Sequence, residues 1–292
     1  MKKGILITGA NGQLGNALRL LSDDFRGFEW HFTDKDELDI TNLSDVESYF
    51  NKHKIDYIIN CAAYTAVDKA ESDAQMAELL NAKAVEYLVL ASNLQQSRLI
   101  HISTDYVFGG THFLPLTEEL PTQPESAYGL SKLNGELFAQ KSQRAIIIRT
   151  SWLYSEFGHN FVKTIQKYAT ERGTLNVVFD QVGTPTYASD LAKAIMIIIN
   201  TIDISTDFNQ YGNYHFANEG VASWYDFAVE ICKMSDIKAD ILPVLSDAFP
   251  TPAKRPSYSV LDKQKIKTTF GIRIPYWKDS LKLCIEKMSA NI

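Results

Sequence analysis

The sequence predicts an α/β protein: a Rossmann-like, doubly wound parallel sheet with a smaller C-terminal α/β lobe that binds substrate. Short runs of β-branched and other apolar residues alternate with longer helical patterns, and this alternation is typical of a parallel sheet with helices on both faces. A glycine-rich turn joins the first apolar run to the first helical pattern, as in nucleotide-binding folds. After Thr150 the alternation loosens, so a second lobe is expected there.

The expected strands are apolar almost throughout, as Ile5, Leu6 and Ile7 are in the first one. Such runs suit parallel strands that are buried on both faces. The six expected strands are residues 4–9, 29–34, 56–62, 98–104, 145–150 and 175–180.

Helical periodicity fills the segments between these strands and recurs in the second half of the chain. The expected helices are residues 13–21, 43–51, 74–93, 127–141, 160–170, 189–200, 223–234 and 277–288. Residues 243–256 are rich in proline and are not expected to form regular helix, because proline lacks a backbone donor and fixes φ.

Two interleaved units are expected. Residues 1–150, with roughly 174–205, would form a dinucleotide-binding domain. Residues 151–173 and 206–292, again roughly, would form the substrate-binding lobe.

Composition and charge exclude several classes of partner. The 292 residues include 29 Lys and Arg against 35 Asp and Glu, for a net charge of −6, whereas binding to nucleic acid or anionic membrane needs a basic surface. The longest apolar run, residues 194–199, is far shorter than the ~20 residues that span a bilayer. The N-terminal residues lack the long apolar core of a signal peptide. We therefore expect a cytoplasmic protein that binds neither nucleic acid nor membrane.

The three cysteines suggest neither a disulfide bond nor a metal site. Cys61, Cys232 and Cys284 are widely spaced and form no Cys-x-x-Cys pair, so neither a disulfide framework nor a zinc site is expected.

The glycine-rich turn has the features of a dinucleotide phosphate loop. Gly9 permits a tight turn, Gly12 lets backbone approach a pyrophosphate, and Gly15 allows the helix to pack closely on the strand. The helix N-terminus then offers free N–H groups to phosphate. Asp34 ends the second expected strand, where an acid commonly binds the adenosine ribose. A purely structural glycine turn is the alternative.

The choice between the two nicotinamide cofactors stays open at this point. The carboxylate of Asp34 would repel a 2′-phosphate and favour NADH, whereas the neighbouring Lys35 would attract that phosphate and favour NADPH.

A tyrosine and a lysine lie four residues apart in an expected helix. Tyr128 and Lys132 would share one helix face, and a nearby ammonium favours the phenolate form of a tyrosine that exchanges protons. Such a pair also arises by chance in a chain of this composition. Its context supports a catalytic role, because Thr104 ends an expected strand at the sheet edge where ligands bind in this fold.

On these residues the chain resembles the extended short-chain dehydrogenase/reductase family, whose members act on nucleotide sugars. The resemblance covers nearly the whole chain. Its motifs are residues 9–15, 60–71 (NCAAYTAVDKAE), 103–108 (STDYVF), the pair Tyr128 and Lys132, 149–154 (RTSWLY), 180–186 (DQVGTPT) and Arg255-Pro256.

The resemblance implies a cofactor site along the phosphate loop and the ends of the following strands. Gly12, Gln13 and Leu14 would contact the phosphates, and Asp39 and Ile40 the adenine end. The segment Ala62, Ala63, Tyr64 and Thr65 would contact the inner ribose and phosphate.

It also implies a role for each group at the reacting end. Tyr128 would donate a proton, Thr104 would polarise the ketone, and Lys132 would position and tune the tyrosine while holding the cofactor ribose. The residues that would contact the sugar are Thr104, Asp105, Trp152, Val67 and Asp68.

Two of the substrate positions have ordinary structural alternatives. The Trp152 ring suits packing on a sugar face, but an isolated tryptophan is more often part of the core. Arg255 suits the dTDP pyrophosphate, since a guanidinium matches phosphate oxygens, but it could equally be a solvated surface arginine.

The reaction that the resemblance implies is hydride transfer from NADPH or NADH to the C4 ketone of dTDP-6-deoxy-L-lyxo-4-hexulose. The product would be dTDP-L-rhamnose, formed in the last step of its synthesis. A monomer or a homodimer is expected. Some relatives hold Mg2+ between subunits, but Asp190 and the C-terminal Ile292 do not support a carboxylate metal site here.

Four alternatives share the fold. A nucleotide-sugar 4,6-dehydratase needs a carboxyl pair, and related dehydratases carry Asp-Glu where this chain has Asp105-Tyr106. A 4-epimerase, or another 4-reductase, would differ in net cofactor consumption or in the sugar. A non-catalytic NADP-binding regulatory subunit is the alternative outside enzymes, and the Tyr128 and Lys132 pair speaks against it.

Overall fold

The computed structural model describes residues 2–110 and 112–290, so Met1, Thr111, Asn291 and Ile292 lie outside it. The larger lobe is built on a six-stranded parallel sheet with the order β10-β5-β4-β3-β1-β2. This sheet confirms the predicted fold class. Its strands are β1 (Lys3–Thr8), β2 (Phe28–Thr33), β3 (Tyr57–Asn60), β4 (Arg98–Thr104), β5 (Ala145–Thr150) and β10 (Gly212–His215).

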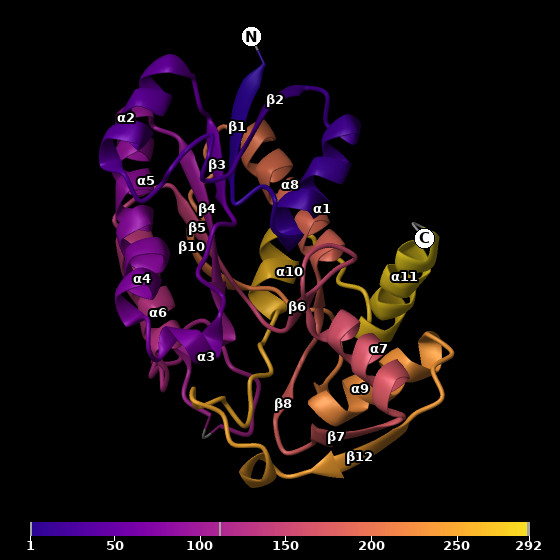
Figure 1. Ribbon diagram of the computed structural model, residues 1–292. Helices are drawn as coiled ribbons and strands as arrows, with labels where there is room; N and C mark the ends of the chain where they lie inside the picture. The colour runs from indigo at the N-terminus through magenta and orange to yellow at the C-terminus, as the bar shows by residue number, and fades with distance from the viewer. Residues whose placement is uncertain (1, 111, 291–292) are drawn as a thin grey trace.

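Helices cover both faces of the sheet (Figure 1). One face carries α1 (Gln13–Leu21), α8 (Ala188–Ile204) and α10 (Gln264–Phe270). The other carries α2 (Leu43–Lys52), α4 (Ala74–Glu78), a π-helical segment (Leu79–Lys83), α5 (Ala84–Gln95) and α6 (Ala127–Ala139), with the short α3 (Val67–Ala70) nearby.

The strand residues alternate between these two helical layers. In β1, Ile5 and Ile7 pack with α1 and α8, whereas Leu6 packs with α2 and α5. Both faces are apolar because side chains alternate along a strand and each face is covered.

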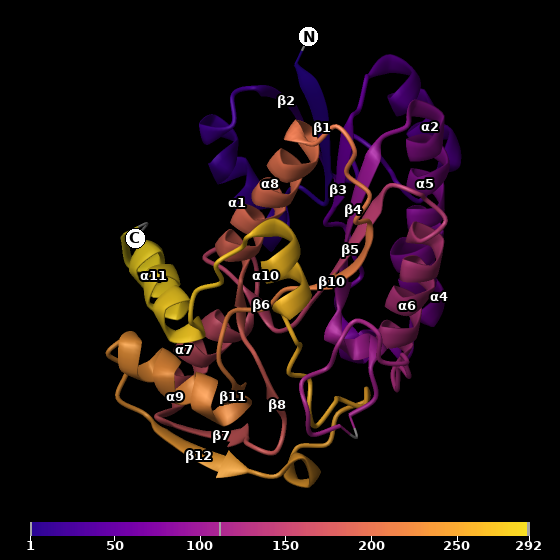
Figure 2. The same cartoon turned by 180° about the vertical axis from the view of Figure 1, so that it is seen from behind.

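The smaller lobe lies beyond the end to which the strands run, at the bottom of Figure 1 and of the reverse view in Figure 2. Its core includes Tyr154, Phe227 and Trp277. Its elements are β6 (Leu153–Tyr154), α7 (Phe161–Arg172), β7 (Thr174–Val178), β8 (Val182–Gly183), β9 (Thr186–Tyr187), β11 (Ala222–Ser223), α9 (Trp224–Met234), β12 (Asp240–Val244) and α11 (Trp277–Ala290).

The strand pairings refine the expected boundaries between the units. Strand β7, expected in the nucleotide-binding domain, pairs with β12, and β10, expected in the substrate lobe, pairs with β5 in the large sheet. Helix α10 likewise packs in the core of the large sheet. The division of the chain into two domains stays a prediction.

The strand order reverses direction at β1, which has β2 on one side and β3 on the other. In open parallel sheets, ligands bind at such a reversal, outside the carboxyl ends of the strands. Gly9 follows β1 with φ +64°, and a Cβ there would lie 2.7 Å from the backbone of Ala62 after β3. The two strand ends therefore meet closely where a ligand is expected.

Within residues 2–110 and 112–290, no helix has both the length and the apolar character needed to cross a membrane.

Candidate active site

A cleft of about 770 Å³ lies at the carboxyl ends of the strands and is lined by both lobes. Its size is typical of sites for small molecules and cofactors. Most of the predicted site residues line it: Gly9, Gly12, Gln13, Leu14, Asp34, Asp39, Ile40, Ala62, Ala63, Thr65, Thr104, Tyr128, Lys132 and Trp152. Six others lie outside its lining, namely Gly15, Tyr64, Val67, Asp68, Asp105 and Arg255.

A backbone hydrogen bond closes the phosphate loop, and no side chain caps the start of α1. The Gly12 N–H donates to the Gly9 carbonyl at 3.0 Å. Helix α1 has no side-chain cap at Gly12 and no acid in its first turn, so its first N–H groups are free to bind an anion. A Cβ on Gly15 would lie 2.5 Å from Ala10, so Gly15 acts by allowing close packing of the helix. These features fit a dinucleotide pyrophosphate.

Gln13 joins this loop to the smaller lobe. Its Oε1 accepts hydrogen bonds from Ser155 Oγ at 3.0 Å and Asn160 Nδ2 at 3.1 Å, and its Nε2 donates to the Leu153 carbonyl at 3.4 Å. Gln13 is one of the residues that the resemblance assigns to the phosphates, and its side chain is engaged with residues 153–160.

The acidic side chains at the adenosine end of the cleft accept hydrogen bonds from the turns in which they lie or that adjoin them. The Asp34 carboxylate accepts the N–H groups of Asn11, at 3.1 Å, and of Lys35, at 2.9 Å. Asp39 accepts both the N–H and the hydroxyl of Thr41, and the hydroxyl contact contributes most to lowering the Asp39 pKa. Lys35 also lines the cleft, so a cation and two acids face the adenosine end together.

Tyr128 and Lys132 lie on the buried face of α6 and line the cleft. Lys132 is only 2% exposed, and its Nζ donates to the Ile102 carbonyl at 2.7 Å. Burial lowers the Lys132 pKa to about 8, against the opposing effects of Glu136 and Cys61. Burial raises the Tyr128 pKa to about 12. Burial, rather than the neighbouring ammonium, therefore has the largest effect on the pKa of the Tyr128 phenol. The sequence had led to the opposite expectation, that the ammonium would favour the phenolate.

Thr104 ends β4 between Tyr128 and Asp105. Its Oγ1 lies 3.0 Å from Asp105 Oδ1, and it accepts the Tyr106 N–H at 3.3 Å. A Thr104 hydrogen bond partly offsets the effect of burial on the Tyr128 pKa. Asp105 is 2% exposed and lies behind Thr104 rather than in the lining of the cleft.

Trp152 follows β5 in a left-handed conformation, with φ +48°, which is unusual for a bulky residue. Its ring stacks on Trp224 of α9, with centroids 3.6 Å apart and planes 11° apart. A Cβ on Gly183 would come within 2.8 Å of the Trp152 ring. The ring that lines the cleft is therefore held on two sides by the smaller lobe.

Asp68 and Arg255 bind each other across the two lobes. Arg255 Nη1 and Nη2 lie 3.0 and 2.7 Å from the two carboxylate oxygens of Asp68, and the Ala253 N–H also donates to Asp68. Hydrogen bonding to Arg255 is the main cause of the lowered Asp68 pKa. Val67 packs beside Tyr128 in a small apolar cluster. The predicted pyrophosphate clamp thus has a carboxylate partner in this structure.

Tyr64 lies behind the cleft and is held there by Asn81 of the π-helical segment. The Asn81 side chain accepts the Tyr64 N–H at 2.8 Å, donates to its carbonyl at 3.1 Å, and donates to Ser131 Oγ at 2.9 Å. Reasoning from the sequence missed Asn81, because a helical pattern does not reveal a π-helical turn. Such turns are frequent at functional sites.

Several further lining residues were also missed. They come from the ends of β4 and β5, from the segments that follow β2, β3 and β5, from β6 and the loop after it, and from α4 and the π-helical segment. A rule about strand ends could have found many of them. They are Leu38, Thr41, Cys61, Met76, Leu79, Leu80, Ile102, Ser103, Thr150, Ser151, Leu153, Gly158 and His159.

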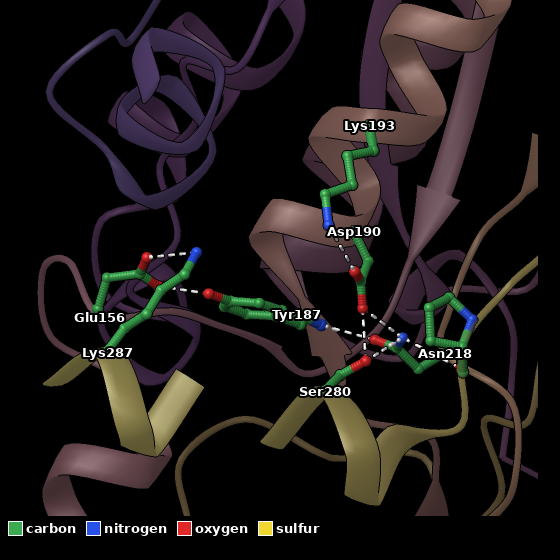
Figure 3. A network of polar contacts seen from close by, with 8 residues as sticks. Glu156, Tyr187, Asp190, Lys193, Asn218, Ser280 and Lys287 are labelled. Atoms are coloured by element: carbon green, nitrogen blue, oxygen red, sulfur yellow. Dashed lines mark hydrogen bonds and ion pairs between the residues drawn. The ribbon is translucent and has the colours of Figure 1, made fainter. Parts of the chain in front are cut away.

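The residues around Asp190 do not fit a shared metal ion. Asp190 is 5% exposed, and its Oδ2 accepts hydrogen bonds from Asn218 and Ser280, as Figure 3 shows. Lys193 lies 3.9 Å from its other oxygen. Over residues 2–110 and 112–290, no group of three or more His, Cys, Asp or Glu side chains is arranged to hold a metal. Asp190 instead ties α8 to α11.

Comparison with known proteins finds a match over the whole length. A family model described as "RmlD substrate binding domain" matches residues 1–290. A dTDP-4-dehydrorhamnose reductase of Aggregatibacter actinomycetemcomitans is 41% identical over 285 residues, covering 95% of this chain and 97% of that protein.

Two solved structures agree closely with this fold. A dTDP-4-dehydrorhamnose reductase from Clostridium acetobutylicum superposes with a TM-score of 0.93 at 42% identity, covering 98% of this chain and 99% of that one. The enzyme of the same name from Bacillus anthracis, solved in complex with NADP, gives 0.93 at 38% identity, covering 98% of this chain and 100% of that one.

Proposed function

The chain belongs to the RmlD substrate binding domain family, and we propose on that basis that it reduces the C4 ketone of dTDP-6-deoxy-L-lyxo-4-hexulose (dTDP-4-dehydro-L-rhamnose) to dTDP-L-rhamnose. It is an oxidoreductase that uses NADPH or NADH. The observation that supports this reaction most is the meeting of Tyr128, Lys132 and Thr104 in one cleft with the phosphate loop.

The cleft residues are suited to reducing a ketone. When bound, the nicotinamide supplies the hydride. Tyr128 keeps its proton at neutral pH, because its pKa is raised to about 12, and it donates that proton to the C4 oxygen as negative charge develops there. Lys132 has a pKa of about 8 and is mostly protonated at neutral pH, so its fixed charge stabilises the developing alkoxide.

The substrate subsite is formed by residues that the two lobes contribute together. Trp152 offers a flat apolar ring for the sugar, and Arg255 offers a forked cation for the pyrophosphate of dTDP. The dehydratase alternative gains no support, because Tyr106 packs its ring against Tyr128, with centroids 5.5 Å apart, where a second carboxyl group would be needed. A monomer or homodimer and a cytoplasmic location stay predictions.

Replacing Tyr128 with Phe tests the assignment. We expect turnover of the keto-sugar to fall by about a hundredfold or more. The loss of reduced-nicotinamide absorbance measures this turnover. Tyr106→Phe is the matched control, because it removes a hydroxyl from the ring packed on Tyr128, and it should retain turnover. Undiminished activity in Tyr128→Phe would refute the role of Tyr128, and no cofactor consumption by the wild type would revive the non-catalytic alternative.

A further inference from the structure

Residues 153–160, which comprise β6 and the loop after it, form one wall of the cleft beside the phosphate loop. Leu153, Gly158 and His159 line the cleft together with the glycines of that loop. A Cβ on Gly158 would be in van der Waals contact with Gln13, 3.5 Å from its Cγ. The position of residues 153–160 therefore sets the width of the cleft where the dinucleotide pyrophosphate is expected.

Two neighbouring residues of this segment, Ser155 and Glu156, join it to opposite lobes. Ser155 Oγ donates to Gln13 Oε1 of the larger lobe at 3.0 Å. Glu156 contacts the smaller lobe instead, as Figure 3 shows: its Oε2 accepts the Tyr187 hydroxyl at 3.0 Å, and its Oε1 lies 3.6 Å from Lys287 Nζ on α11. The segment is thus fixed between the phosphate loop and α11.

The ion pair between Glu156 and Lys287 is unequally buried. Only 3% of the Glu156 side chain is accessible, against 49% of the Lys287 side chain. Lys287 Nζ also lies 5.6 Å from the centre of the Tyr187 ring, so the ammonium is held where it faces the carboxylate. In the part of the chain that the structure describes, Lys287 is the only cation paired with Glu156. A buried carboxylate depends strongly on such a partner, because an unpaired buried charge is costly.

We propose that Lys287 is a positioning residue for cofactor binding: its charge keeps Glu156 buried, and Glu156 keeps residues 153–160 against the phosphate loop. The inference rests on the reductase proposed above and concerns its NADPH. Without the ammonium, the carboxylate reaches water by moving outward together with its loop. The neutral hydrogen bonds at Gln13 each contribute little and do not offset an unpaired buried charge. Helix α11, none of whose described residues lines the cleft, thereby controls cofactor affinity.

Replacing Lys287 with Met tests the proposal, because Met keeps an unbranched side chain and removes the charge. Fluorescence titration of the full chain with NADPH measures the Kd. We expect the Kd to rise about tenfold, as it would if residues 153–160 lay in place for about a tenth of the time. The KM for the keto-sugar at saturating NADPH should stay unchanged, because bound cofactor restores the loop. Lys287→Arg keeps the charge and should keep the wild-type Kd.

The double variant Glu156→Gln/Lys287→Met separates the effect of charge from the effect of packing. A neutral amide can stay buried and still accept the Tyr187 hydroxyl, so the Kd should return to within about threefold of the wild-type value. Lys282→Met is the matched control on the same helix. It removes an exposed lysine that lies 3.9 Å from Glu286, and it should leave the Kd unchanged.

Each outcome bears on the proposal, once circular dichroism has confirmed that the variants are folded. An unchanged Kd in Lys287→Met overturns it. So does a double variant that binds NADPH no better than Lys287→Met, because the loss would then come from the packing of α11. An equal rise in the KM for the sugar would also overturn it, since the whole smaller lobe would be disturbed. A wild type that binds NADPH without reducing the keto-sugar would instead refute the proposed function.

Discussion

At the scale of single residues, burial controls the chemistry of the cleft more than pairwise charge does. The same cause lowers the pKa of Lys132 and raises those of Tyr128 and Asp105. Each shift disfavours the charged form, as expected where water is excluded. The result is a phenol that keeps its proton, beside a lysine that titrates near the physiological range.

The raised Asp105 pKa should also appear in the stability of the protein. A folded state that binds a proton more tightly than the unfolded chain loses stability as pH rises through the interval between the two pKa values, here from 3.8 to about 6. Above this interval Asp105 is ionised in the folded wild type, and burying its charge lowers the free energy of unfolding in full. Asp105→Asn should therefore be more stable than the wild type by about 1–3 kcal/mol at pH 8. That advantage should vanish below about pH 4. Urea unfolding at both pH values measures it.

An exposed acid provides the control for this measurement. Asp240 lies at the exposed start of β12, and Asp240→Asn should change stability equally at both pH values. An Asp105→Asn protein no more stable than the wild type at pH 8 would contradict the expectation.

At the scale of elements, the sequence predicted the regular parts well because their signals are local. Helix α1 and strands β4 and β5 have the predicted bounds, since apolar runs and a helix start after Gly12 mark them. Strand β10 was not predicted. It is four residues long, with the sequence GNYH, and it becomes a strand through its pairing with β5.

The site shows the same division between local and tertiary information. The phosphate loop and the Tyr128 and Lys132 pair carry short-range patterns, and both line the cleft. The bond between Arg255 and Asp68 depends on how distant segments pack. No spacing in the sequence predicts it.

The stacked rings of Trp152 and Trp224 lead to an element-scale prediction. Helix α9 supplies Trp224, which supports Trp152 in its unusual backbone conformation. Trp224→Leu should raise the KM for the dTDP-sugar by about tenfold, because the platform loses its support, and should leave the KM for NADPH unchanged. Trp30→Leu is the matched control, since Trp30 stacks on Phe32 of β2 outside the cleft. Equal changes in both KM values would contradict this account.

At the scale of the whole molecule, the cleft is formed where two lobes are joined by polar contacts. Gln13 binds the loop at residues 153–160, and Asp68 binds Arg255. The ion pair is partly exposed, with 23% of the Arg255 side chain and 42% of the Asp68 side chain accessible. Such pairs contribute little to stability, so Arg255 can exchange its partner at small cost.

This exchange of partners gives a prediction. It distinguishes binding of the substrate pyrophosphate by Arg255 from a purely structural role of the Arg255–Asp68 pair between the lobes. If Arg255 binds the substrate pyrophosphate, Arg255→Lys should raise the KM for the dTDP-sugar by about tenfold, because lysine lacks the fork. Asp68→Asn should leave that KM unchanged or lower it, because the guanidinium is released. Steady-state kinetics on both variants decides the matter. A similar rise in KM for both would indicate that the pair only braces the lobes.

The three hydrogen bonds of Gln13 have a consequence for how such proteins diverge. Position 13 belongs to the nucleotide-binding half, whereas Leu153, Ser155 and Asn160 belong to the other half. The two halves are therefore not interchangeable parts. A chimera that took its phosphate loop from a distant relative would lose this junction unless residues 153–160 came with it, so these positions should be inherited as one unit.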